Sequence, residues 1–177
     1  NIMYQAHTAK ALTIKNAKGV VPEFPIHEND TSTDLNVVTL TVLRNKSGQS
    51  GISIPMVVSQ SEGIKPWLSA FYYLREVGKF GIGGNNLSFY LELLPDVKLQ
   101  RTTVREKIDT NPKLRRALEF TSDAFQLIMT RPEYKDIEYI IPMEKLYKGL
   151  IDMGYDWDKL LETRGYPLID NYNEDYP

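Results

Sequence analysis

Glycine and asparagine gather in the segment 78–90, which has the sequence GKFGIGGNNLSFY. A glycine-rich loop binds phosphate where a strand leads into a helix, because backbone N–H groups and the positive end of the helix dipole then face the anion. Here the flanking patterns predict the opposite order, with a helix before the glycines and a strand after them. The partial charge at the C-terminal end of a helix is negative and repels anions. The segment therefore predicts a tight turn, with Gly78 ending the helix, and no bound nucleotide.

A second pattern places carboxylates beside lysines. Glu92, Asp96 and Lys98 fall in ELLPDVK, and Glu133 and Lys135 follow in PEYK. Nuclease chemistry of this kind needs the carboxylates on adjacent strands around one metal ion, and a long predicted helix separates the two groups. A metal-dependent hydrolase or nuclease at Glu92 and Asp96 is therefore only a distant alternative function.

The chain offers little else for catalysis or metal binding. Its only histidines are His7 and His27, and it has no cysteine. A zinc site needs a third ligand that no pattern supplies, and the polar loop after His27 lacks the spacing of a calcium loop. No nucleophile motif is present. We expect no catalytic residue, no cofactor and no bound metal, and we favour a protein that is not an enzyme.

The strongest charge feature is the basic stretch 98–116, which holds seven basic and two acidic side chains. Such a stretch, with aromatic residues near it in sequence, is typical of proteins that bind single-stranded nucleic acid. The chain as a whole carries a net charge of −2, so a solvated or salt-bridged surface is the competing interpretation. The candidate anion-binding or nucleic-acid-binding residues are Lys98, Arg101, Arg105, Lys113, Arg115 and Arg116.

Charge and tyrosine content also favour contacts with proteins. Residues 120–177 carry 6 basic and 12 acidic side chains, a balance of −6, so a basic middle and an acidic end could dock head to tail between copies or on another protein. The chain has 11 tyrosines against 6 phenylalanines, and tyrosine suits surfaces that are half buried. The candidate protein-interface residues are Tyr72, Tyr147, Tyr155, Trp157, Tyr172 and Tyr176.

Periodic apolar patterns predict the elements that would position these residues. The clearest strand is 35–45, where Val38, Leu40 and Val42 fall on one face and threonines on the other. Pro55 predicts an edge or a bulge in the next strand. The other predicted elements are strands 9–15, 52–60, 87–94, 97–104 and 136–141, a turn at 16–19, a loop at 21–34, helices 65–80 and 112–130, and a helical pair within 142–165.

This order of elements predicts an α+β fold with an antiparallel sheet of about five strands. The helices 65–80 and 112–130 would pack on the sheet, and a helical hairpin would follow near the C-terminus. We expect a core domain over 1–141 and a C-terminal helical hairpin with a polar tail, 142–177, packed on the same domain. No apolar run is long enough for a membrane span, so no membrane insertion is expected.

Two functions of different classes follow from these features. The favoured hypothesis is a non-enzymatic structural or protein-interaction subunit of a larger assembly, with a protein partner or self-assembly. The alternative is a single-stranded nucleic-acid-binding protein that uses the basic stretch 98–116. Residue types alone assign neither a compartment nor a particular partner.

Overall fold

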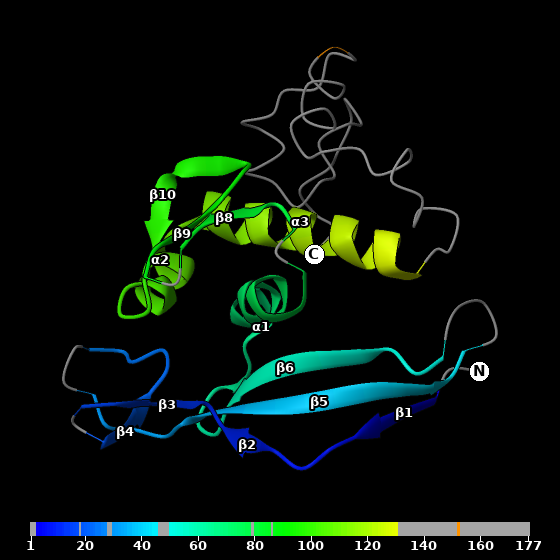
Figure 1. Ribbon diagram of the computed structural model, residues 1–177, viewed down its shortest axis with the longest axis horizontal. Helices are drawn as coiled ribbons and strands as arrows, with labels where there is room; N and C mark the ends of the chain where they lie inside the picture. Colours follow the sequence, from blue (N-terminus) through cyan, green and yellow to red (C-terminus); the bar gives the residue numbers. More distant parts are fainter. Residues whose placement is uncertain are drawn as a thin grey trace, which may run out of the picture.

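The fold combines antiparallel sheets with helices that lie on one side of the largest sheet (Figure 1). This confirms the predicted mixture of strands and helices with antiparallel pairing. The predicted strand 136–141 and the helical pair within 142–165 lie outside the described residues. In this computed structural model the described residues are 3–17, 19–27, 30–45, 50–78, 80–85, 87–130 and 152.

The centre of the main sheet is a long hairpin of β5 (Leu35–Arg44) and β6 (Ser53–Ser59). Both strands are rich in β-branched residues, which suit a pleated surface, and both were predicted from sequence. Pro55 pairs with Thr39 of β5 on one side. On its other side β6 has no described strand beside it at this position, because β7 pairs only with Val58 and Ser59. Because proline cannot donate to a ladder, this edge position is the predicted one.

Three short strands extend the main sheet, and two smaller sheets stand beside it. The strand order is β1-β5-β6-β7, with β2 pairing the other part of β5. The small sheets are the hairpin β3–β4 and the meander β10-β9-β8. Gly19 has a φ of 109° in the predicted turn of the hairpin. The bounds are β1 Met3–Ala6, β2 Lys10–Ala11, β3 Thr13–Asn16, β4 Gly19–Pro22, β7 Gly63–Ile64, β8 Ile82–Gly84, β9 Phe89–Leu91 and β10 Leu94–Leu99.

The structure corrects the predicted strands between residues 87 and 104. The turn after β9 falls at 92–93, inside the predicted strand 87–94, and Pro95 and Asp96, which separate the two predicted strands, belong to β10. Burial explains the difference, because Leu99 is fully buried when β10 begins at Leu94. The predicted strand 97–104 was wrong beyond residue 99.

Among the described residues, α1, α2 and α3 form the second layer. α1 (Pro66–Tyr73) begins with a proline and continues into a π-helical turn at Leu74–Gly78, and both lie within the predicted helix 65–80. α2 (Val104–Thr110) was not predicted, and it buries Val104 and Ile108 one helical turn apart. α3 (Pro112–Thr130) has its predicted bounds, and the Asn111 side chain caps it by accepting a hydrogen bond of 3.0 Å from the Leu114 amide. In the described part of the chain, no helix is long and apolar enough to cross a membrane.

The hydrophobic core lies on the side of the main sheet that faces the helices. α1 packs against β6 and α3. The main sheet contributes only Leu35 and Val57 to the buried cluster, with Val37 packed against it. The other large side chains of the core that are almost completely buried are Phe24, Phe71, Leu74, Leu91, Leu99, Leu114 and Leu118.

Candidate interaction surfaces

The main sheet has one face toward the core and one face away from it. Residues directly opposite each other in an antiparallel ladder share a face, and successive residues alternate between faces. Val37 pairs with Val57, and this pair faces the core. Val38 pairs with Met56, and this next pair along the ladder therefore points away from the core. Figure 1 shows α1, α2 and α3 on the core side of the sheet.

We call the side away from the helices the outer face, and most of its side chains are apolar. None of its members belongs to the core cluster or packs against it. Val42 is buried, whereas Tyr4 and Ile64 are 56% and 59% exposed and the others are exposed in part or largely. From the strand registers, the apolar residues of the outer face are Tyr4, Ala6, Ala11, Val38, Leu40, Val42, Ile54, Met56, Val58 and Ile64, and Asn36 shares this face.

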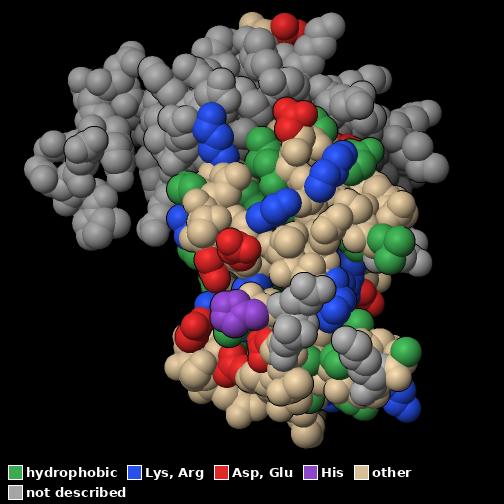
Figure 2. Space-filling model, turned by 90° about the vertical axis from the view of Figure 1, so that its left-hand side faces the viewer, with side chains coloured by type: hydrophobic (Ala, Val, Ile, Leu, Met, Phe, Trp, Pro, Cys, Tyr) green, Lys and Arg blue, Asp and Glu red, His purple; other side chains and the backbone are tan. Residues whose placement is uncertain are grey.

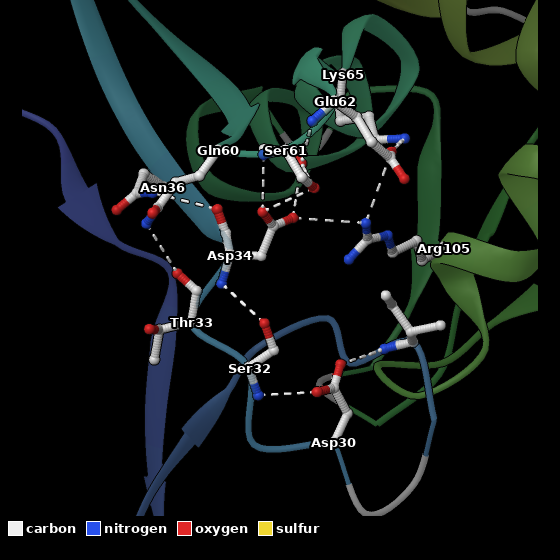
Figure 3. A network of polar contacts seen from close by, with 12 residues as sticks. Asp30, Ser32, Thr33, Asp34, Asn36, Gln60, Ser61, Glu62, Lys65 and Arg105 are labelled. Atoms are coloured by element: carbon white, nitrogen blue, oxygen red, sulfur yellow. Dashed lines mark hydrogen bonds and ion pairs between the residues drawn. The ribbon is translucent and has the colours of Figure 1, made fainter.

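Among the candidate basic residues, Arg105 and Arg116 are held by carboxylates. The Arg105 side chain is only 8% exposed, and its Nη2 lies 3.7 Å from Asp34 Oδ2 and 3.8 Å from Glu62 Oε2 (Figure 3). The Arg116 Nη1 donates a hydrogen bond of 2.9 Å to Glu119 Oε2. Such ion pairs occupy these cations with internal partners.

The other four candidate basic residues lie in separate surroundings. Arg101 donates a hydrogen bond of 2.8 Å to the carbonyl oxygen of Pro22, which ties it to the β3–β4 hairpin. The Lys98 ammonium lies 4.3 Å from the Tyr90 ring centre, and the Arg115 guanidinium lies 4.9 Å from the ring centre of Trp67. Lys113 falls in the first turn of α3. Because Arg105 is buried, the six cations are not all available on an open surface, and binding of nucleic acid stays a prediction.

Asp34 is the centre of a polar network at the start of β5 (Figure 3). Its carboxylate accepts hydrogen bonds from Ser59 Oγ at 2.6 Å and from the Ser61 amide and hydroxyl at 3.1 Å. The bond from Ser59 is the main cause that holds the pKa of Asp34 below its ordinary value, against the opposing effect of burial; the Ser61 bonds and the Arg105 charge add to it. Its acceptor sites are thus taken up by the protein itself.

The loop before β5 carries a second internally bonded carboxylate. Asp30 accepts hydrogen bonds from the amides of Ile26 at 3.0 Å and Ser32 at 2.8 Å, and these bonds lower its pKa. Sequence interpretation treated this segment as a solvated polar loop. The alternation of Asp and Ser is typical of side chains that bond to nearby backbone, which is the signal for this ordered turn.

A cavity of about 370 Å³ adjoins this network, between the loop and α2. It is lined by Ile26, His27, Glu62, Arg105, Glu106, Asp109 and Thr110. Figure 2 shows charged side chains of both signs and a histidine around the hollow between the sheet and the helices. Among the residues that the structure describes, no three His, Asp or Glu side chains are grouped so that they could hold a metal ion.

A larger cavity, of about 480 Å³, adjoins the glycine segment. Gly83, Gly84 and Asn85 line it together with Arg75. The guanidinium of Arg75 already contacts Glu23 and donates from Nε to Glu76 Oε1 at 2.8 Å, so two carboxylates balance its charge.

The glycines of this segment have backbone roles. Gly84 has a φ of 109°, and a Cβ at Gly83 would lie 2.5 Å from the Tyr90 ring. The turn itself lies at 85–88, where Asn85 and Ser88 exchange backbone hydrogen bonds of 2.9 and 3.2 Å. The turn was predicted, although Gly83 and Gly84 belong to β8.

The remaining candidate residues are placed as follows. Glu92 and Asp96 are exposed, and their partners in the hydrolase alternative, Glu133 and Lys135, lie outside the described residues. Tyr72 is half-buried, and burial, then the charges of nearby carboxylates, raises the pKa of its phenol. The other candidate interface residues lie outside the described residues, and these are Tyr147, Tyr155, Trp157, Tyr172 and Tyr176.

Comparison with protein-family models, with curated proteins and with solved structures gives no match. Function therefore has to be inferred from the surfaces of this chain. Of these surfaces, the outer face is the one whose apolar side chains have no partner in the described core.

Proposed function

We propose that this protein is a non-enzymatic interaction subunit, and that it docks onto a protein surface through the outer face of its main sheet. The observation that carries this proposal is the apolar character of a sheet face outside the core. Antiparallel sheets with one side in water usually alternate apolar and polar residues. Here the side of β5 and β6 away from the core is the more apolar one, because the core side also carries Thr39, Thr41, Ser53 and Ser59. An apolar side outside the core favours a covered second side.

Removal of the apolar outer face from water would favour docking. Burial of apolar surface stabilises a complex by about 25 cal/mol per Å² before the costs of association. Large contiguous apolar patches on folded proteins mark sites of contact with proteins or membranes. The alternating pleat of a sheet presents a regular, rigid surface, so little conformational entropy is lost when it binds.

The polar clusters support a role other than catalysis. A catalytic carboxylate or cation must be free to bond to a substrate. Asp34 and Asp30 bond to nearby hydroxyl and amide groups, and Arg75 contacts two carboxylates. These groups stabilise loops and the contact between layers.

A lysine scan across the sheet tests whether the outer face is open. We expect Leu40→Lys to lower the free energy of unfolding by about 1 kcal/mol or less, because a lysine on an open face keeps its ammonium in water. Val57→Lys puts the charge into the core instead, because Val57 is fully buried on the other side of the sheet. Its cost should be several kcal/mol, about 3 or more.

The measurement is urea unfolding followed by circular dichroism, at a protein concentration where only monomer is present. Val20→Lys is the control for a lysine on an exposed strand position, because Val20 is 64% exposed and outside the outer face. If Leu40→Lys unfolds the chain as Val57→Lys does, the outer face is part of an interior and cannot dock a partner.

A further inference from the structure

We infer that the partner on the outer face is a second copy of this chain, packed sheet against sheet about a two-fold axis. This inference rests on the proposed function and names its partner. A two-fold interface uses the same patch on both subunits, so one self-complementary surface is sufficient.

The first argument is the charge of the surface. Two identical copies present the same charges to each other, and like charges that face each other oppose association. None of the residues of the outer face between Asn36 and Val42 is charged, and Arg44 lies beyond them at the end of β5, so this repulsion is absent from the middle of the face. Asn36 pairs with Val58 at one end of the face and provides a polar margin. Apolar side chains of one copy can therefore meet the same apolar side chains of the other.

The second argument is area. The β5–β6 ladder runs from the pair Leu35–Ser59 to the pair Thr41–Ser53, seven residues or about 24 Å in length. Over most of this length the sheet is three strands wide, about 14 Å, because β1 and β2 share one edge of β5 and β7 pairs with β6 over two residues only. The flat footprint, with β7 included, is then roughly 380 Å² per copy, and the relief of the side chains brings the total for two copies to about 850 Å², which is below the roughly 1,000 Å² of a stable specific interface and typical of weak association.

This area sets the expected affinity and geometry. A specific interface of this size is at the weak end, so we expect a reversible dimer with a micromolar dissociation constant. Packed sheets lie about 10 Å apart with their strands at about 30° to each other. Side chains near the axis, such as Leu40 and Met56, then meet their counterparts in the second copy.

Sedimentation velocity over a range of protein concentrations tests the association. We expect the native chain to show a monomer–dimer equilibrium, and Leu40→Lys to weaken it by about tenfold or more, because each lysine would lose water at the interface. Val20→Lys should leave the equilibrium constant unchanged, because this equally basic substitution lies on an exposed strand outside the outer face.

Crosslinking tests the geometry, and the absence of cysteine makes a single engineered thiol unique. Val38→Cys places the thiol on the outer face, and Val20→Cys places it elsewhere. A short bifunctional maleimide should link two copies of the first variant into a covalent dimer and leave the second variant monomeric.

The outcomes separate this inference from the proposed function. A native chain that stays monomeric at all concentrations, while Leu40→Lys remains folded, overturns the second copy and leaves the outer face open to a different protein. A dimer that Leu40→Lys does not weaken, or that crosslinks only through Val20→Cys, also overturns the inferred geometry. A chain that Leu40→Lys unfolds overturns both, because a segment of the same chain then covers the face.

Discussion

Arg105 reaches from α2 toward the start of β5, where its guanidinium lies between Asp34 and Glu62 at distances longer than a hydrogen bond. The closest contact of Asp34 is instead the hydroxyl of Ser59, at 2.6 Å. Hydrogen bonds to a carboxylate contribute more to stability than bonds between neutral groups. At this position the serine, rather than the arginine, is the main cause of the lowered pKa of Asp34.

The substitution Ser59→Ala should make the protein less stable at neutral pH, by about 2 kcal/mol. The pKa of Asp34 in the native chain is lower than in the unfolded chain. Its carboxylate therefore contributes stability that is complete above the unfolded pKa of about 3.9 and is lost as the pH falls through the native pKa. The stability difference between the native chain and Ser59→Ala should narrow in acid, which urea unfolding at neutral pH and at about pH 3 would measure.

Ser122→Ala is the control. Ser122 Oγ donates a hydrogen bond of 3.0 Å to the backbone carbonyl oxygen of Glu119, which is a neutral acceptor, so its loss should cost about 1 kcal/mol and should not depend on pH. A Ser59→Ala penalty that stays constant between neutral pH and acid would contradict the role given to Asp34.

At the scale of the elements, two glycines with the same φ angle allow the cost of backbone strain to be measured apart from the cost of a steric clash. Gly19 and Gly84 both have a φ of 109°, but a Cβ at Gly19 would meet no atom within 4 Å, whereas one at Gly84 would lie 2.2 Å from the Ser88 carbonyl oxygen. Gly19→Ala should lower the free energy of unfolding by about 1 to 2 kcal/mol, because alanine is strained in this backbone conformation. Gly84→Ala should cost at least about 1 kcal/mol more, because β8 and β9 must move apart. Thermal unfolding of both variants would measure this difference. An equal loss of stability in the two variants would contradict the close approach of Gly84 to Ser88.

The elements that were predicted correctly are those with strong local signals. β5, β6 and α3 follow from alternation, helical spacing and the caps Asn111 and Pro112. The segment 92–104 was misassigned because the turn depends on which leucines reach the core, and that is decided by distant parts of the chain.

The candidate surfaces were harder to predict for a related reason. The spacing predicts that Val38, Leu40 and Val42 share one face, but it does not show that the core lies on the opposite side, with Leu35 and Val57. The carboxylate neighbours of Arg105 lie more than 40 residues away in the chain, so its basic sequence context alone predicts an exposed cation. Both features depend on how separate elements pack, which residue spacing does not encode.

For the whole molecule, the two sources of self-association respond differently to salt. Sequence charge predicts a head-to-tail contact, which screening weakens because the Debye length is about 8 Å at physiological ionic strength. Contact through the outer face removes apolar surface from water, and sulfate strengthens such burial.

We therefore expect the dimer dissociation constant to stay within about twofold as sodium chloride is raised, and to fall in sodium sulfate. Sedimentation equilibrium at several concentrations of each salt gives this constant. Dissociation of the dimer by sodium chloride would favour contact between the basic stretch 98–116 and the acidic residues that follow it.

Three arginines from the second half of the described chain hold its first strands and loop to the helices. Arg75 contacts Glu23 across 52 positions, Arg101 bonds to Pro22 across 79, and Arg105 lies beside Asp34. Closing such large loops costs more entropy than forming the β5–β6 hairpin, whose partners are close in sequence. We expect the hairpin and α1 to come together early during folding and the arginine contacts to close late. Unfolding would then start by release of these three side chains, while the hairpin that carries the outer face stays paired.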